Sequence, residues 1–95
     1  MINLRVSPAV LLKLTNKHRV GQREVEQCFE NKCGLFLEDT RAQHKTDPAS
    51  LWFIAPTHDE RLLKIVFVFK DGLIHIKTAF EPNPSEVDLY ELYGK

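Results

Sequence analysis

The fold of this chain is decided by residues 61–80, which read RLLKIVFVFKDGLIHIKTAF. Both ends of the stretch are rich in Ile, Val and Phe, which favour β-strands. The Asp71-Gly72 pair between them is typical of a two-residue type I′ turn. We therefore predict a β-hairpin whose strands run over Leu62–Phe69 and Leu73–Phe80.

The turn also predicts which residues of the two strands are paired. Lys70 faces Leu73 across the turn, and counting outward from that pair places Phe67 opposite Ile76. The face that holds Phe67 and Ile76 is apolar and is expected to be core. The opposite face carries three polar side chains that could act on an anion: Lys64, His75 and Lys77.

The segments before the hairpin predict two helices and two short strands. Ser7-Pro8 is a typical helix start, and apolar residues at three- and four-residue steps extend that helix over about 8–18. A second helix is expected over Gln22–Asn31, with Cys28 on its apolar stripe. Strands are expected at Leu35–Glu38 and Leu51–Ala55, separated by a polar loop over Thr40–Ser50.

Two further expectations concern the strand before the hairpin and the segment after it. If residues 58–61 form a four-residue loop, Trp52 and Ile54 join the apolar core face, while Phe53 and Ala55 join the polar face. Pro82 and Pro84 end the last strand, and Ser85 is expected to cap a C-terminal helix. The predicted fold class is α+β, with two N-terminal helices, an antiparallel sheet of three to four strands and a C-terminal helix.

Length and composition fit one ordinary globular domain over residues 1–95. The chain is 43% hydrophobic and 27% charged. It has no apolar run near the roughly 20 residues of a membrane span, and Pro8 and Lys13 interrupt any signal peptide. A cytoplasmic protein with no membrane association is expected. The two cysteines and four histidines lack metal-ligand spacing, so neither a metal nor a cofactor is expected.

Charge is balanced in total but not along the chain. Thirteen basic residues match thirteen acidic ones, which argues against a general polyanion binder. Residues 1–23 contain five bases and no acid, whereas residues 81–91 contain four acids and no base. The basic start can be a solvated face or an anion-binding surface, and both readings stay open.

Short motifs along most of the chain resemble a known family. The motifs are Lys17-His18 with Val20, Glu24 and Phe29, the strand Arg61–Phe67, the pair Thr78-Ala79, and Glu86 with Tyr90. This pattern resembles the BrnT-like toxins of the RelE/ParE superfamily. The chain has Arg19, Phe80 and Val87 where the family pattern has a glycine and two arginines.

The resemblance implies a RelE-like fold, a metal-independent endoribonuclease that inhibits translation, and a cognate antitoxin protein as partner. RNA cleavage of this kind needs a base for the 2′-hydroxyl, cations for the phosphate and an acid for the leaving oxygen. The catalytic candidates are His75, Lys77, Lys64 and Arg61. The candidates for binding RNA or a partner are Lys17, His18, Arg19 and Arg23.

Two functions of different classes therefore stay open. The chain is either the toxin of a type II toxin–antitoxin system, acting on RNA, or a non-catalytic protein-interaction module on the same fold. The polar cluster on the hairpin favours the toxin. The balanced charge and the two missing arginines favour the interaction module.

Overall fold

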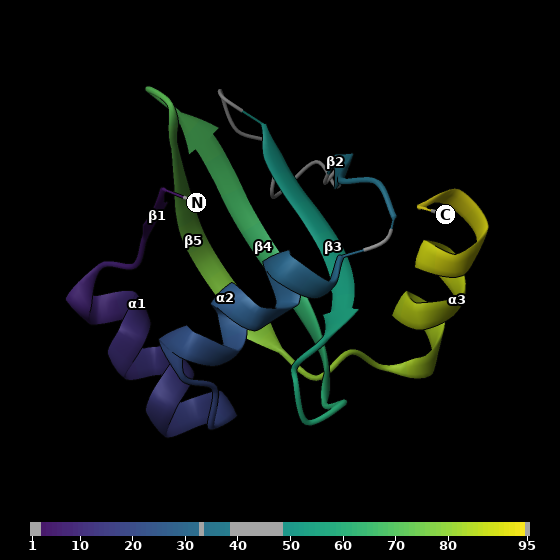
Figure 1. The fold of residues 1–95 in the computed structure, drawn as a ribbon, viewed down its shortest axis with the longest axis horizontal. Helices are drawn as coiled ribbons and strands as arrows, with labels where there is room; N and C mark the ends of the chain where they lie inside the picture. Colours follow the sequence, from purple (N-terminus) through teal and green to yellow (C-terminus); the bar gives the residue numbers. More distant parts are fainter. Residues whose placement is uncertain (1–2, 33, 39–48, 95) are drawn as a thin grey trace.

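A computed structural model of the chain describes residues 3–32, 34–38 and 49–94. The elements are, in order, β1 (Leu4–Arg5), α1 (Pro8–Lys13), the π-helix η1 (Leu14–His18), α2 (Gln22–Asn31), β2 (Leu37–Glu38), β3 (Ser50–Pro56), β4 (Leu62–Lys70), β5 (Leu73–Phe80) and α3 (Pro84–Tyr93). The α+β class is confirmed, with long β3, β4 and β5 strands at the centre (Figure 1).

The sheet has five strands in the order β1-β5-β4-β3-β2, one more than the three to four expected. It is also not wholly antiparallel, because β1 runs parallel to β5 and pairs Leu4 with Ile74 and Arg5 with His75. No sequence pattern predicts β1, because its two residues are too few to show a period. The expected strand over residues 35–38 is present only as β2, at Leu37–Glu38. The loop expected over residues 40–50 lies mostly outside the described residues.

The Asp71-Gly72 turn is confirmed, and so is the register next to it. Both residues have positive φ, 56° and 76°, as a type I′ turn requires. The pairing follows the prediction from Lys70 and Leu73 as far as Phe67 and Ile76. A β-bulge then shifts it by one residue, so the predicted pairs beyond that point are wrong.

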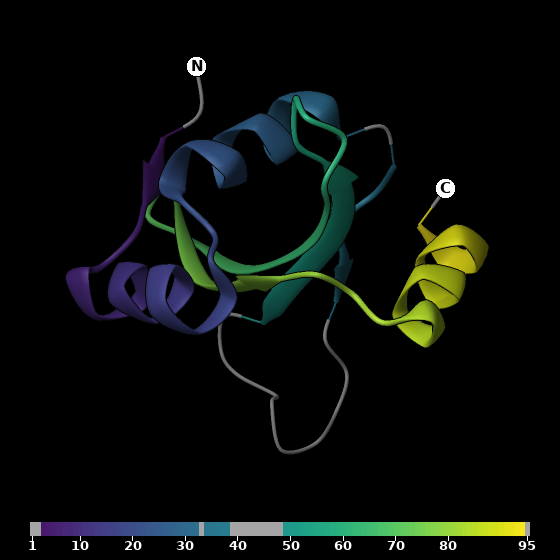
Figure 2. The same cartoon turned by 90° about the horizontal axis from the view of Figure 1, so that it is seen from below.

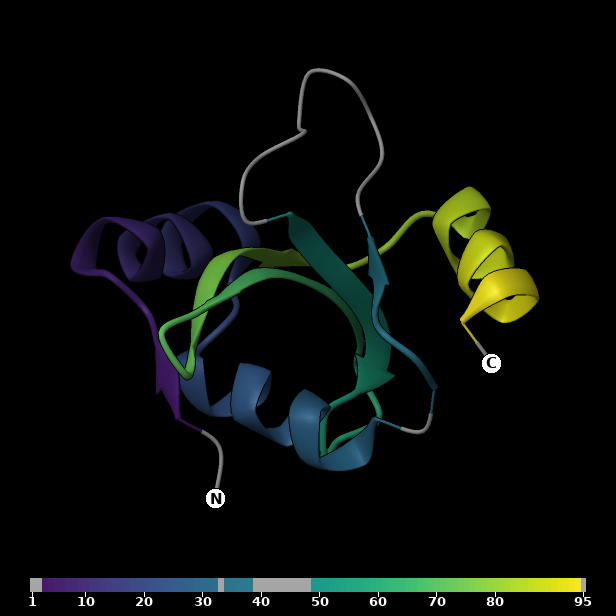
Figure 3. The same cartoon turned by 90° about the horizontal axis from the view of Figure 1, so that it is seen from above.

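The bulge places Lys77 as an extra residue of β5. Val66 pairs with Thr78 and Lys64 with Phe80, rather than with Lys77 and Ala79 as expected. A bulge lets one strand carry an additional residue and increases its twist. Figure 2 shows the sheet curving around α2, and Figure 3 shows the same arrangement from the opposite side.

The curved sheet therefore has two distinct faces. Its inner face packs against α2, and its outer face lies toward α1, η1 and α3 (Figure 2). On the inner face, four aromatic rings from three parts of the chain meet with centroids 4.7–6.2 Å apart: Phe29, Phe36, Phe53 and Phe67. Cys28 is also buried there, as its place on the helix predicted, and burial raises the pKa of its thiol to about 12.

The faces of β3 are the reverse of those expected. The loop before β4 has three residues rather than four, because Thr57 N donates to the Arg61 carbonyl at 2.9 Å and Glu60 adopts a left-handed φ of 65°. One residue fewer in the loop turns every side chain of β3 over. Phe53 therefore joins Phe67 on the inner face, while Trp52 is buried on the outer face against Tyr90 of α3.

The helices follow their local signals. The predicted helix over residues 8–18 is present as α1 and η1, capped by Ser7, whose side chain accepts from Val10 N. The predicted helix over residues 22–31 is confirmed as α2. Helix α3 is capped by Asn83 rather than Ser85: the Asn83 side chain accepts from Glu86 N at 2.8 Å. Asn83 is the better cap because Pro84 then takes the first helical position, where its missing N–H is harmless.

We expect Phe67→Ala to lower the free energy of unfolding by about 3–5 kcal/mol, because Phe67 is 1% exposed and contacts three other rings. The matched control is Phe69→Ala, on the same face of the same strand but 55% exposed, which should change stability by about 1 kcal/mol or less. Urea denaturation of both variants measures the difference. Equal losses would contradict the inner face as described.

Candidate functional site

The Arg61 side chain donates hydrogen bonds to four other residues. Its Nε donates to Glu81 Oε2 at 2.7 Å, and Nη1 donates to both carboxylate oxygens of Glu24 at 3.1 and 3.2 Å. Nη1 and Nη2 also donate to the carbonyls of Arg19 and His18, at 2.8 and 3.0 Å. The hydrogen bond to Glu81, followed by that to Glu24, raises the pKa of Arg61 against the opposing effect of burial.

These bonds place the end of η1, the start of α2 and the end of β5 around one guanidinium. The carbonyls at a helix end lack partners within the helix, and Arg61 supplies two of the missing donors. Glu24 contributes to the same junction, since its Oε1 also accepts from Gly21 N at the start of α2. Arg61 was predicted to grip a phosphate, but all three of its nitrogens already donate within the protein. Its role in the structure is to hold the junction together.

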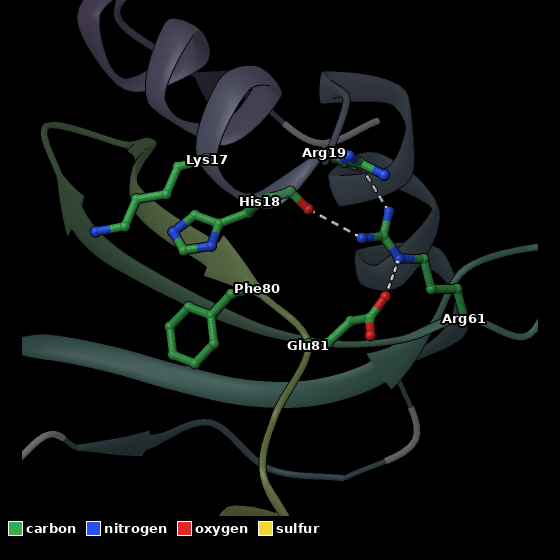
Figure 4. Close-up of a pocket in the computed structure, with 6 residues that line it drawn as sticks. All are labelled: Lys17, His18, Arg19, Arg61, Phe80 and Glu81. Atoms are coloured by element: carbon green, nitrogen blue, oxygen red, sulfur yellow. Dashed lines mark hydrogen bonds and ion pairs between the residues drawn. The ribbon is translucent and has the colours of Figure 1, made fainter.

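A cleft of about 380 Å³ opens beside this junction. Figure 4 shows the side chains that line it: Lys17, His18, Arg19, Arg61, Phe80 and Glu81. Within residues 3–32, 34–38 and 49–94, no carboxylate lies within ion-pair distance of Lys17 or Arg19. The cleft thus presents two uncompensated cations on either side of a histidine.

The His18 ring lies against the Phe80 ring, with centroids 5.6 Å apart. Burial lowers the pKa of His18 below its usual value, and the charges of Lys17 and Lys13 lower it further. The imidazole is therefore mainly neutral near pH 7 and can accept a proton. A neutral base flanked by cations is a combination that can act on a phosphate ester.

The backbone at the cleft is irregular. The last turns before it form a π-helix, Leu14–His18, and Arg19 then adopts a left-handed φ of 55°. Short π-helices and non-glycine residues in left-handed conformations are both found often at functional sites.

Lys64, predicted to be catalytic, is buried on the outer face. Its Nζ donates to Glu86 Oε2 of α3 at 2.6 Å. The ammonium also lies 4.6 Å from the ring centre of Trp52 and 5.7 Å from that of Phe80. Two rings and a carboxylate surround the charge, so Lys64 fastens α3 to the sheet and does not face the cleft.

His75 lies away from Lys64. The register pairs His75 with Val68, four residues along β4 from Lys64, which is about 13 Å at the usual rise of a strand. Lys77 is exposed, and its Nζ donates to Ser50 Oγ at 3.0 Å. Lys64 and His75, which were predicted to share one catalytic site, are therefore far apart. Lys17, His18 and Arg19, in contrast, line the same cleft.

Arg23 is exposed on α2 and does not line the cleft. Phe80 and Glu81 line it without having been predicted as site residues. The predicted hairpin already indicates that these two residues lie near Arg61, because the end of β5 pairs with the start of β4, which Arg61 directly precedes.

Comparison with known proteins finds no family model that matches this chain and no curated protein that matches it significantly. Among the described residues, none of the helices is long and apolar enough to cross a membrane. In the same part of the chain, no group of three or more His, Cys, Asp or Glu side chains could hold a metal ion.

We expect Arg61→Lys to lower the free energy of unfolding by about 1–3 kcal/mol, because an ammonium cannot donate to four separated partners and hydrogen bonds to charged groups are lost. Lys17→Met, which removes a cation of the same cleft that has no acidic partner, should leave stability nearly unchanged. Thermal or urea unfolding measures both. An Arg61→Lys variant as stable as the parent would contradict the structural role.

Proposed function

We propose that this chain is an RNA-cleaving toxin of a toxin–antitoxin pair, and that its active site is the cleft at the end of η1. The observation that carries the proposal is the cleft itself: Lys17 and Arg19 have no acidic partner among the described residues, and His18 lies between them with a pKa lowered by burial. The resemblance to BrnT-like toxins supports the same class of function. The proposal moves the chemistry from the hairpin to the cleft because Lys64 and Arg61 are held in ion pairs.

The proposed reaction needs no metal. The His18 imidazole takes the proton of a ribose 2′-hydroxyl, the 2′ oxygen attacks the neighbouring phosphorus, and the bond from phosphorus to the 5′ oxygen breaks. The Lys17 ammonium gives a proton to the departing 5′ oxygen. Arg19 stabilises the added negative charge on the phosphorane oxygens through its planar donors. The products are a 2′,3′-cyclic phosphate and a free 5′-hydroxyl.

A second observation supports a protein partner under either function. Helix α3 exposes three large apolar side chains, Leu89, Leu92 and Tyr93, with exposures of 46%, 70% and 62%. Exposed apolar side chains grouped on one helix are common at protein–protein contacts. For a toxin this surface suits an antitoxin, and for a non-catalytic module it suits another protein. Loss or retention of RNA cleavage separates the two functions.

We expect His18→Ala to slow RNA cleavage by about 100- to 10,000-fold while the thermal melt changes little. The assay uses purified protein, a synthetic single-stranded RNA and EDTA, with cyclic phosphate ends detected on the products. Arg23→Met is the matched control, because it removes an exposed cation outside the cleft and should cleave as the parent does. A DNA strand that corresponds to this RNA should not be cut, because it lacks the 2′-hydroxyl that attacks the phosphorus.

Other outcomes of this assay are equally informative. Full loss of activity in His75→Ala with a normal rate in His18→Ala would place the active site on the hairpin, as the sequence predicted. A parent protein that cuts no RNA and does not arrest bacterial growth on expression would reject the toxin in favour of the interaction module.

We expect Arg19→Gly to stabilise the fold and to weaken cleavage. Relief of the left-handed strain at Arg19 should raise the free energy of unfolding by about 0.5–1 kcal/mol, after the greater freedom of glycine in the unfolded chain is subtracted. Loss of the guanidinium should lower the rate constant for cleavage at the same time. Urea unfolding and the cleavage assay test the two effects, and a variant that is both more stable and fully active would remove Arg19 from the site.

A further inference from the structure

A second pocket lies at the opposite end of α1 from the cleft. It has a volume of about 370 Å³ and is lined by Arg5, Val6, Ser7, Leu73, His75 and Ile76. The parallel pairing of β1 with β5 puts Arg5 directly beside His75. Neighbouring strands are about 4.8 Å apart, so the two basic side chains can reach one small anion between them.

Within the described residues, no acidic side chain neutralises the charge of this pocket. No carboxylate in the described part of the chain lies within ion-pair distance of Arg5 or His75. Arg5 is exposed and His75 is partly buried. An arginine fork beside an imidazole that can donate a hydrogen bond is well suited to a phosphate group.

Cations continue between the two pockets. Lys13 and Lys17 lie four residues apart along α1 and η1, and the Lys13 ammonium donates to the backbone carbonyl of Lys77 at 3.3 Å. Lys77 is itself exposed on β5. The basic residues at the start of the chain and on β5 therefore form one track, from Arg5 and His75 at one end to His18 and Arg19 at the other.

The length of the track can be found in two ways that agree. The ten steps from residue 8 to residue 18 along α1 and η1 give about 15 Å at the usual α-helical rise. Five steps along β5, from His75 to Phe80, give about 16 Å. At about 3.4 Å per nucleotide in a stacked strand, this length corresponds to about five nucleotides, and an extended strand needs fewer.

We propose that the pocket between β1 and β5 is a second phosphate-binding site, and that one single strand of RNA lies along α1 and η1 with a phosphate in each pocket. The proposal rests on the proposed function of the cleft and adds the substrate class, single-stranded RNA. A single strand fits because the basic residues follow one phosphate backbone between the two pockets, as they do in grooves that bind single strands.

The first experiment tests the pocket without relying on cleavage. Uridine monophosphate is titrated into the protein while the ring resonances of His18 and His75 are followed by NMR. Both should shift, and Arg5→Gln should abolish the shift of His75 while that of His18 remains. No shift of His75 in the parent, or an unchanged shift in Arg5→Gln, would overturn the second site. A shift of His75 without one of His18 would instead count against the cleft.

The second experiment tests whether one strand joins the two pockets. Fluorescein-labelled 2′-O-methyl oligouridylates, which cannot be cleaved, are compared as a dinucleotide, a pentanucleotide and an octanucleotide by fluorescence anisotropy. Affinity should rise from the dinucleotide to the pentanucleotide and then level off. In Arg5→Gln, the salt dependence of pentanucleotide binding should become shallower by about 0.7 in log Kd per log salt, the amount expected for one lost phosphate contact on a single strand.

The control for this experiment is Lys70→Gln, which removes an exposed cation at the tip of the β4–β5 hairpin, outside both pockets. It should keep the salt dependence of the parent. A dinucleotide that binds as tightly as the pentanucleotide, or an Arg5→Gln variant with the salt slope of the parent, would reject a continuous track.

Discussion

The guanidinium of Arg61 is the interaction on which the arrangement of this chain depends. It joins Glu24 and Glu81 to the carbonyls of His18 and Arg19, which come from three separate parts of the sequence. A lysine could satisfy only part of this set, because its donors radiate from one nitrogen, whereas the arginine fork reaches several partners in fixed directions. The cleft exists because these segments are held around the Arg61 guanidinium. Each nitrogen of Arg61 donates within the protein, whereas Lys17 and Arg19 in the same cleft face the solvent.

A second set of contacts runs from the cleft across the outer face of the sheet. The His18 ring touches Phe80, Phe80 and Trp52 flank the Lys64 ammonium, and Trp52 continues to Tyr90 of α3. Glu86 neutralises Lys64, which makes burial of that charge tolerable. The cations in and near the cleft are thus of two kinds. Lys64 and Arg61 are enclosed by rings, carboxylates or carbonyls and stabilise the fold. Lys17 and Arg19 have no acidic partner among the described residues. Residue type alone does not separate the two kinds.

The features that the sequence predicts correctly are those that depend on neighbouring residues, and the features that it misses depend on contacts between distant residues. The Asp71-Gly72 turn and the extents of α1–η1 and α2 were predictable because their signals are local. The bulge at Lys77 and the three-residue loop before β4 each change the register by one residue, and that step depends on packing across the sheet rather than on any nearby motif. That Lys17, His18 and Arg19 lie close together was predictable because they are adjacent in the sequence. Their proximity to Phe80 and Glu81 was not predictable, because it depends on Arg61, which holds segments that are distant in the sequence together.

The left-handed conformation of Arg19 bears on whether the cleft has a function. A glycine would relieve the strain, and every bond that the Arg19 backbone makes to Arg61 would survive the change, since only its carbonyl takes part. Strain that a single substitution could remove is expected to persist where the side chain is needed for something else. The Arg19 side chain has no acidic partner in the described part of the chain and lines the cleft beside a neutral histidine. Among the described residues, no contact therefore gives this side chain a structural task, which is why the strain at Arg19 supports the proposal of a site in the cleft.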